Sequence, residues 1–258
     1  MGLFEKLIKQ TPLNNSYQKY KVAKAINHHK KLEEKLFPIR VQFYNQIINK
    51  ADLVFDVGAN VGNRVEAFLA CEGNVIAIEP QPNCVEMLIQ KFGNSIIIEN
   101  VGLSDKEGNL EMKIASDSTI STFNTEYISK TKERFKYSKW EGTINVKITT
   151  LDKLIEKYGI PMFCKIDVEG FELQVLKGLH SIIPYISFEY CVPEMHEQAL
   201  NCLKHLNDLS PNATYNYSIG ETMQWTLKNW LNFSNFIQHV NSKEFNTSLF
   251  GDIYIKSN

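Results

Sequence analysis

The sequence predicts an α/β fold in which helices cover both faces of a mostly parallel sheet. Short, continuous apolar runs alternate with helical patterns from residue 53 onward. Such runs, rich in Val and Ile, are typical of strands that are buried on both faces of a sheet. The first run ends in a turn that contains two glycines, and a helical pattern follows it directly. Strand, glycine turn and helix in this order are typical of sheets that bind a ligand at the carboxyl ends of their strands.

The composition is that of one ordinary globular domain. The chain has 258 residues, of which 43% are hydrophobic and 22% are charged, and its net charge is -1. We expect residues 51–258 to form the domain and residues 1–50 to form an N-terminal helical extension, with helical patterns at 17–36 and 41–48. A nearly neutral chain without a basic block lacks the charge that general nucleic-acid binding needs. We therefore expect no nucleic-acid partner.

The spacing of the cysteines and the length of the apolar runs indicate the cellular compartment that we expect for the protein. The five cysteines include no pair at CxxC spacing. This favours buried thiols in a reducing cytosol over a disulfide framework or a zinc site. No apolar run has the length of a membrane span, so we expect no stable membrane insertion and a cytoplasmic protein.

The first half of the domain follows the alternation closely. We expect strands at residues 53–57, 75–79 and 95–99, and helices at 63–71 and 83–92. A Gly-Asn pair follows each helix, and glycine after a helix is a common C-terminal signal.

The alternation is interrupted after the third strand. Residues 110–115 and 144–150 have the pattern of two antiparallel strands, and a polar and aromatic connection at 116–142 joins them. Long connections of this kind are usually functional or mobile. We expect this connection to form part of a lid over the ligand crevice, with the polar residues Ser118, Ser121, Thr122 and Asn124.

The βα alternation then resumes. The expected elements are a helix at 151–158, a strand at 162–167, a helix that ends at 176, a strand at 185–190 and a helix at 195–209. They are followed by a short segment at 215–217, an aromatic helical segment at 223–240 and a last strand at 251–256.

The turn after the first strand reads Asp56-x-Gly58-x-Asn60-x-Gly62. Glycine has no Cβ and tolerates positive φ, so a ligand can approach its backbone closely. A dinucleotide fingerprint would need further glycines at positions 60 and 63, where this chain has Asn60 and Asn63. An acid ahead of the turn favours a cationic ligand group. S-adenosylmethionine, with its amino group, sulfonium and adenosine, fits this demand.

Two further strand ends offer contacts for a nucleoside. Glu79 ends the second strand, where a carboxylate can accept both hydroxyls of a ribose. The alternative for Glu79 is a solvent-exposed acid at the end of a strand. Asn100 follows the third strand and is placed to bracket an adenine together with the backbone of Val101, although asparagine at a strand end is also ordinary turn chemistry.

Charged residues surround the carboxyl end of the strand at 162–167. We expect Asp167 to face the reactive end of the cofactor and Glu169 to lie in the site. In a structural alternative, Lys165 pairs with a neighbouring carboxylate and Glu169 complements the N-terminus of the next helix. We assign Glu172 to a structural role of this kind.

Six motifs occur in one order along the chain, at residues 54–62, 78–80, 101–105, 150–152, 165–172 and 187–189. Together they resemble the FkbM family of S-adenosylmethionine-dependent methyltransferases over roughly residues 52–190. The specific combination is Asp-x-Gly-Ala-Asn-x-Gly followed by Lys-Ile-Asp-Val-Glu-Gly. The resemblance implies a class I methyltransferase fold, with a seven-stranded, mostly parallel sheet that contains one antiparallel strand. It also implies a methyltransferase that usually O-methylates a hydroxyl on a sugar or secondary metabolite.

The resemblance also implies the residues of the cofactor site and the kind of partner. The acceptor would be a small molecule or a glycan, and residues 1–50 and 195–258, outside the shared core, would shape its site. The expected contacts to S-adenosylmethionine are Asp56, Gly58, Ala59, Asn60, Gly62, Asn63, Glu79, Pro80, Asn100, Val101, Ser104 and Asp167.

Methyl transfer from a sulfonium is an in-line displacement, and a hydroxyl acceptor must also lose a proton. We expect Asp167 or Glu169 to be the base, with Glu189 and His196 as weaker candidates. Trp140, Trp225 and Trp230 are candidates for acceptor walls, or for ordinary core packing. We expect no metal, because no His or carboxylate cluster is evident in the sequence.

Two other functions stay open. One is an NAD-dependent oxidoreductase or epimerase on a Rossmann fold, against which Asn60 and Asn63 argue. The other is a non-catalytic, nucleoside-binding relative, and the intact residues argue against it, namely Asp56, Gly58, Glu79 and Asp167. The sequence does not indicate an oligomeric state.

Overall fold

The computed structural model describes residues 31–257. Most of the helix expected at 17–36 therefore lies outside the described residues. Residues 31–44 are helical, and residues 45–50 are mostly turn. The chain divides into two compact units, Met1–Ile39 and Arg40–Asn258, and the second unit contains every strand that the structure describes. The expected boundary at residue 50 stays a prediction.

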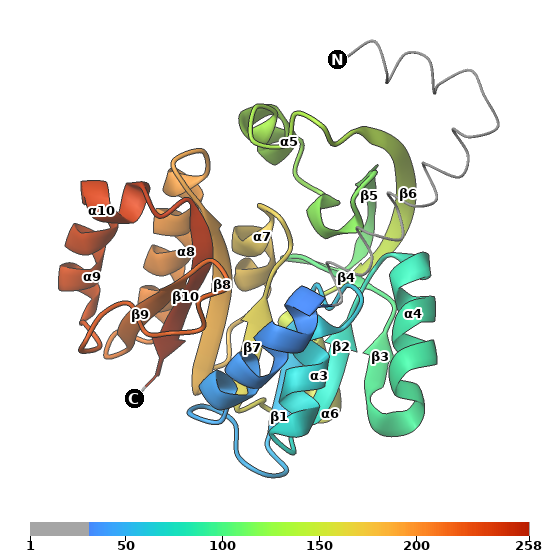
Figure 1. Cartoon of the computed structure of the whole chain (residues 1–258), viewed down its shortest axis with the longest axis horizontal. Coiled ribbons are helices and arrows are strands. Elements are labelled where there is room, and N and C mark those ends of the chain that lie inside the picture. Colours follow the sequence, from blue (N-terminus) through green and yellow to red (C-terminus); the bar gives the residue numbers. More distant parts are fainter. Residues whose placement is uncertain (1–30, 258) are drawn as a thin grey trace. The chain divides into compact units, whose positions relative to one another are not determined.

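The second unit is built on a seven-stranded sheet in the order β3-β2-β1-β7-β8-β10-β9 (Figure 1). Only β10 runs antiparallel to its neighbours in this sheet, β8 and β9. This topology confirms the expected fold. The strands are β1 (Leu53–Val57), β2 (Asn74–Ile78), β3 (Ile97–Glu99), β7 (Phe163–Ile166), β8 (Tyr185–Cys191), β9 (Thr214–Ile219) and β10 (Phe250–Lys256).

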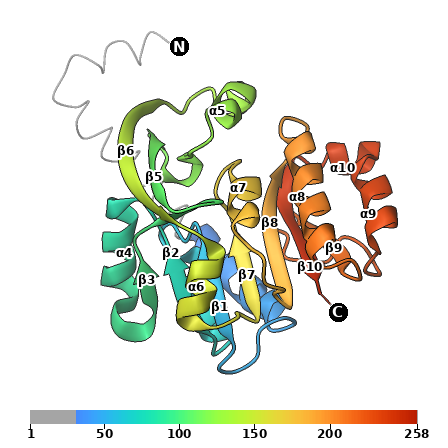
Figure 2. The ribbon, with the colours of Figure 1, turned by 180° about the vertical axis from the view of Figure 1, so that it is seen from behind.

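Helices bury both faces of this sheet, as the continuous apolar strands require (Figures 1 and 2). Along β1, Val54 belongs to one core cluster while Phe55 and Val57 belong to the other. The Val54 cluster includes residues of α3 (Asn63–Ala70) and α4 (Pro82–Phe92). The opposite cluster includes residues of α6 (Leu151–Tyr158), α7 (Glu172–Lys177), α8 (His196–Leu209), α9 (Phe233–Val240) and α10 (Lys243–Asn246). Among the described helices, none has the length and apolar character that a bilayer crossing requires.

A second, three-stranded sheet interrupts the alternation after β3. Its order is β4 (Gly102–Leu103), β6 (Trp140–Thr149) and β5 (Gly108–Ala115). β5 and β6 are antiparallel, as predicted from the sequence. The connection between them contains the short helix η2 (Ser118–Ile120) and α5 (Thr125–Thr131).

The prediction of a helical segment at 223–240 was wrong for its first half. Only α9 is helical there. In the residues before α9, backbone N–H and carbonyl groups form hydrogen bonds with side-chain and backbone groups of β9. Asn216 donates to the Leu227 carbonyl at 2.9 Å and accepts from the Leu227 N–H at 3.0 Å. Tyr215 and Leu231 exchange both backbone hydrogen bonds. The segment thus lies along β9 as irregular chain.

The tryptophans of this segment pack into the core. The Trp225 and Trp230 rings lie 4.9 Å apart, and Trp225 also contacts the rings of Phe43 and Tyr254. The core-packing alternative therefore describes both tryptophans.

Two ion pairs join the loop after β9 to two helical segments. Glu221 lies in this loop, Arg64 lies on α3 and Arg40 lies in the helical residues 31–44. Arg64 Nη2 lies 2.7 Å from Glu221 Oε1, and Arg40 Nη2 lies 3.1 Å from Glu221 Oε2. Burial raises the pKa of Glu221, but the two guanidinium groups outweigh it and lower the pKa from 4.5 to about 2. The carboxylate is therefore ionised throughout the neutral range.

We predict that Glu221→Gln destabilises the protein, because two arginines lose their shared anion. The Glu221 side chain is 41% exposed, so we expect about 1–2 kcal/mol rather than the roughly 3–5 of a fully buried pair. Since the folded pKa is lowered, the contribution is present above pH 4.5 and is lost as the pH falls toward 2. Thermal unfolding measured across this range should show that the difference in stability between the variant and the parent becomes smaller as the pH falls.

Glu72→Gln is the matched control, since Glu72 pairs with Lys50 where both side chains are mostly exposed. It should change the free energy of unfolding by less than about 0.5 kcal/mol. Equal effects of the two substitutions would contradict a special role of the Glu221 network.

Candidate active site

The glycine turn after β1 lies directly against the end of β7. Gly58 has φ 84°, and a Cβ at this position would lie 1.8 Å from the backbone carbonyl oxygen of Asp167. The Asp167 N–H donates to the Val57 carbonyl at 2.9 Å. Gly62 has φ 81°, and its Cβ would lie 2.4 Å from the Phe92 ring. The turn and the Asp167 loop therefore form one continuous edge at the carboxyl ends of the strands.

The Glu79 carboxylate holds the turn from the β2 side. Its Oε2 accepts from the Asn60 N–H at 2.7 Å and its Oε1 from the Gln81 N–H at 2.8 Å. Glu79 is 1% exposed, which overturns the alternative of a solvent-exposed acid. Burial raises its pKa to about 7, although the two backbone N–H groups oppose the shift. Each carboxylate oxygen can accept a second hydrogen bond, and two adjacent hydroxyls are donors that could supply these bonds.

Asn60 and Gln81 connect the turn to the β5–β6 connection. Asn60 adopts φ 48°, a left-handed conformation that asparagine tolerates better than most residues. Its amide lies 3.4 Å from Ser118 Oγ, and Gln81 Nε2 donates to the Ser118 carbonyl at 3.1 Å. Sequence reasoning missed Gln81, whose role depends on contact with a segment 37 positions away.

Asp56 and Ala59 are the buried residues at the base of the turn. Ala59 is buried and donates its N–H to the Ile78 carbonyl at 3.1 Å. Asp56 is 2% exposed, and its Oδ2 has no hydrogen-bond partner in the described part of the chain. Burial raises the pKa of Asp56 to about 6, although Lys165 and Arg64 lower it.

The remaining residues expected at the cofactor belong to the elements that surround the turn. Asn100 Nδ2 donates to the carbonyls of Glu79 and Pro80, so it ties the ends of β2 and β3 together. Asn63 is the first residue of α3. Val101 packs against the larger core cluster.

Ser104 lies beside the end of α7, since a Cβ on Gly178 would lie 2.3 Å from the Ser104 carbonyl oxygen. Its role at the cofactor stays a prediction without support from these contacts.

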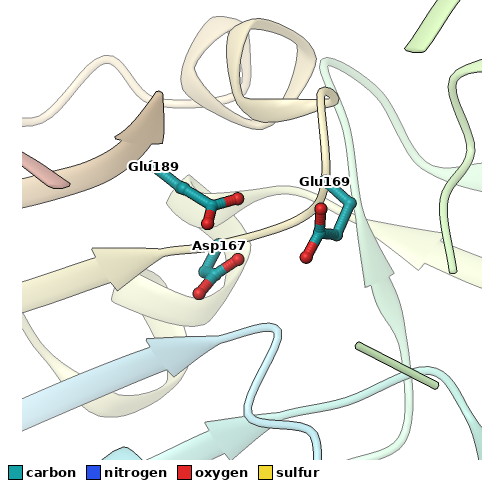
Figure 3. A group of neighbouring side chains, drawn as sticks. All are labelled: Asp167, Glu169 and Glu189. Carbon is teal, nitrogen blue, oxygen red and sulfur yellow. The ribbon is translucent and has the colours of Figure 1, made fainter. Parts of the chain in front are cut away.

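Three carboxyl groups converge next to the turn (Figure 3). Asp167 and Glu169 follow β7, Glu189 lies on β8, and one oxygen from each lies within 4.8 Å of the others. The sequence prediction of no metal rested on the absence of such a cluster, and that premise was wrong. Acidic groups can gather without a cation, so the prediction itself stays untested.

A buried lysine supports this cluster. Lys165 is 1% exposed, and its Nζ lies 2.7 Å from Asp167 Oδ2 and 3.7 Å from Asp252 Oδ1. Burial lowers the pKa of Lys165, but the two carboxylates outweigh it, so the lysine stays charged. The alternative in which Lys165 pairs with a neighbouring carboxylate is thus realised, and the paired carboxylate is Asp167.

The three carboxyl groups differ in their surroundings. Burial and the nearby charge of Asp167 raise the pKa of both Glu169 and Glu189 well above the ordinary value. Asp167 has the ammonium group of Lys165 at hydrogen-bond distance. Burial and mutual repulsion in a cluster of this kind disfavour the ionisation of all its carboxyl groups at once, a common feature of acid–base sites.

Glu172 and His196 have structural contacts. Glu172 Oε1 accepts from the N–H groups of Val168 and Gly170, and its Oε2 accepts from Gln198. These contacts agree with the structural role assigned to Glu172. His196 Nε2 lies 3.1 Å from the Val240 carbonyl, which joins α8 to α9.

The polar residues expected in a lid are mostly packed against the site. Thr122 is fully buried and donates to the Glu169 carbonyl at 2.7 Å, and Asn124 donates to the Gly170 carbonyl at 2.5 Å. Ser121 is buried and accepts from the Ala115 N–H. Trp140 donates to the Ile120 carbonyl, so it holds the connection itself together. The connection therefore contacts the turn through Ser118 and the Asp167 loop through these residues.

Comparison with known proteins agrees with this geometry. The sequence model of the methyltransferase FkbM domain matches residues 56–225, a span that holds the turn, Glu79 and the carboxyl cluster. The hexuronic acid methyltransferase AglP of Haloferax volcanii is 29% identical over 150 residues, which are 56% of this chain. The match covers 56% of AglP, so the chain spans about half the length of that relative.

Solved structures are similar at lower identity. The precorrin-6y C5,15-methyltransferase of Geobacter metallireducens is 10% identical, with a TM-score of 0.44 over 86% of this chain and 89% of that one. A TehB-like SAM-dependent methyltransferase of Corynebacterium glutamicum is 8% identical, with a TM-score of 0.45 over 92% of this chain and 99% of that one.

The family match extends over more than half of the chain and contains both halves of the site. The chain therefore belongs to the FkbM family of S-adenosylmethionine-dependent methyltransferases.

Proposed function

We propose that this methyltransferase transfers a methyl group to an oxygen of a sugar acceptor, free or within a glycan. The observation that carries the proposal is the carboxyl cluster of Asp167, Glu169 and Glu189 beside the glycine turn. A hydroxyl acceptor needs a nearby proton acceptor, whereas a better nucleophile needs only alignment. Several carboxyl groups in one place also suit the many hydroxyl donors of a sugar.

The donor half of the site is assigned to the turn and its neighbours. S-adenosylmethionine supplies an electrophilic methyl group when it is bound. Glu79 would accept the ribose hydroxyls, and the backbone of Gly58 and Gly62 would allow the close approach of the ligand. Asn100 and Val101 would border the adenine. Asp56, with its unpartnered oxygen, adds negative potential behind the turn.

The acceptor half is assigned to the carboxyl cluster. Asp167 would take the hydroxyl proton, because it follows β7 directly beside the glycine turn and its Oδ2 is held 2.7 Å from Lys165 Nζ. Glu169 and Glu189 would orient the sugar through hydrogen bonds to neighbouring hydroxyls. The relative AglP is named for a hexuronic acid, so uronic acid glycosides are the first acceptors to examine.

We predict that the protein releases S-adenosylhomocysteine when it is given S-adenosylmethionine and methyl β-D-glucuronide. Methyl β-D-glucoside is the matched acceptor that lacks only the carboxylate. NMR of the product distinguishes a methyl ether from a methyl ester, and both are O-methylation. Transfer to amine acceptors but to no hydroxyl or carboxyl group of a panel of sugars would contradict the proposal.

We predict that Asp167→Asn slows the transfer by roughly 10²–10⁴, the usual contribution of a positioned base. The dissociation constant of S-adenosylhomocysteine should change little, because the asparagine keeps the shape of the side chain. Steady-state kinetics and calorimetry measure the two quantities separately.

Asp208→Asn is the control, since it makes the same chemical change on the exposed side of α8. It should leave both the rate and the binding unchanged. A rate for Asp167→Asn that equals the parent rate would exclude Asp167 as the base.

A further inference from the structure

We propose that Tyr127 is a positioning residue that holds the Glu169 carboxyl in the acceptor half of the site. The proposal rests on the function proposed above, because it gives Glu169 its place beside the acceptor. Tyr127 lies on α5, within the β5–β6 connection and away from the strand ends that carry the carboxyl cluster.

Tyr127 contacts Glu169 through its hydroxyl and the adjacent Gly170 through its ring. The hydroxyl donates a hydrogen bond to Glu169 Oε2, and the tyrosine is only 2% exposed. The ring packs on the next residue of the loop, since a Cβ on Gly170 would lie 2.5 Å from Tyr127 Cδ2. Burial and the facing Glu169 raise the pKa of Tyr127, so its hydroxyl keeps the proton that it donates.

The backbone at Glu169 and Gly170 has an uncommon conformation, and residues of the β5–β6 connection form hydrogen bonds to it. Glu169 has φ 54° and Gly170 has φ 83°, so two successive residues are left-handed and the first is not a glycine. A non-glycine residue in this region persists where the surrounding structure fixes it, and such positions cluster at functional sites. Thr122 and Asn124 supply that restraint, through hydrogen bonds to the carbonyls of Glu169 and Gly170.

Burial and the acidic neighbours of Glu169 disfavour its ionised form at this position. Asp167 and Glu189 present carboxyl oxygens within 4.8 Å, and Glu172 lies three positions further along the chain. Lys165, the nearby cation, is paired with Asp167 and Asp252. The Tyr127 hydroxyl donates to Glu169 Oε2 and is therefore the contact that fixes the Glu169 carboxyl beside these acidic neighbours. Without it, we expect the carboxyl to turn away from its two neighbours.

Tyr127→Phe tests the proposal, because it removes the donor and keeps the ring over Gly170. A crystal structure of the variant with S-adenosylhomocysteine should show the Glu169 carboxyl outside the 4.8 Å group. With methyl β-D-glucuronide, kcat should fall roughly ten- to hundredfold, the effect of losing a hydrogen bond to a charged or polarised group. Binding of S-adenosylhomocysteine should stay unchanged.

Tyr215→Phe is the matched control. Tyr215 is fully buried, and its hydroxyl has no hydrogen-bond partner among the residues that the structure describes. Removing this hydroxyl should alter neither the structure of the loop nor the rate. A general effect of losing a buried tyrosine hydroxyl would appear in both variants.

A double-mutant cycle with Glu169→Gln separates this proposal from the proposed function. If Tyr127 acts through Glu169, Tyr127→Phe should add little to the loss already caused by Glu169→Gln. Additive losses, or a Glu169 carboxyl that stays in place in the crystal structure of Tyr127→Phe, would overturn the role of Tyr127. A Glu169→Gln variant with the parent rate would instead contradict the role proposed for Glu169 itself.

Discussion

The site depends on the close contact between the backbone at Gly58 and the carbonyl of Asp167. No side chain fits there, because a Cβ would overlap the carbonyl oxygen at 1.8 Å. Parallel pairing of β1 with β7 brings Val57 opposite Ile166, so the chain leaves both strands at the same level. The turn that we propose to receive the donor and the loop that we propose to carry the base are therefore in direct contact with each other.

The β5–β6 connection holds these two parts at a fixed spacing. Ser118 contacts Asn60 and Gln81 on the side of the turn, while Tyr127 contacts Glu169 on the side of the Asp167 loop. In-line methyl transfer gains much of its rate from alignment, so contacts to both the turn and the Asp167 loop have a direct chemical use. The connection thus contacts both parts of the proposed site, and its expected role as part of a lid stays a prediction.

The sequence predicted what local patterns determine. Strand and helix periodicity placed nearly every strand of the large sheet, and the strand ends placed Glu79 and Asp167 at its carboxyl edge. Contacts between distant segments could not be predicted. Tyr127 meets Glu169 across 42 positions, and Glu189 joins the carboxyl cluster only through the pairing of β7 with β8. The first half of the helical segment expected at 223–240 was wrong for the same reason, because the backbone there bonds to β9.

The most direct test is a calorimetric titration of S-adenosylhomocysteine and of NAD into the parent protein and into Gly58→Val. We expect the parent to bind S-adenosylhomocysteine and not NAD. The variant, with its side chain forced against Asp167, should lose this binding while circular dichroism shows the parent's secondary structure. Binding of S-adenosylhomocysteine by Gly58→Val with the parent's affinity, or binding of NAD alone by the parent, would contradict the assignment of the glycine turn.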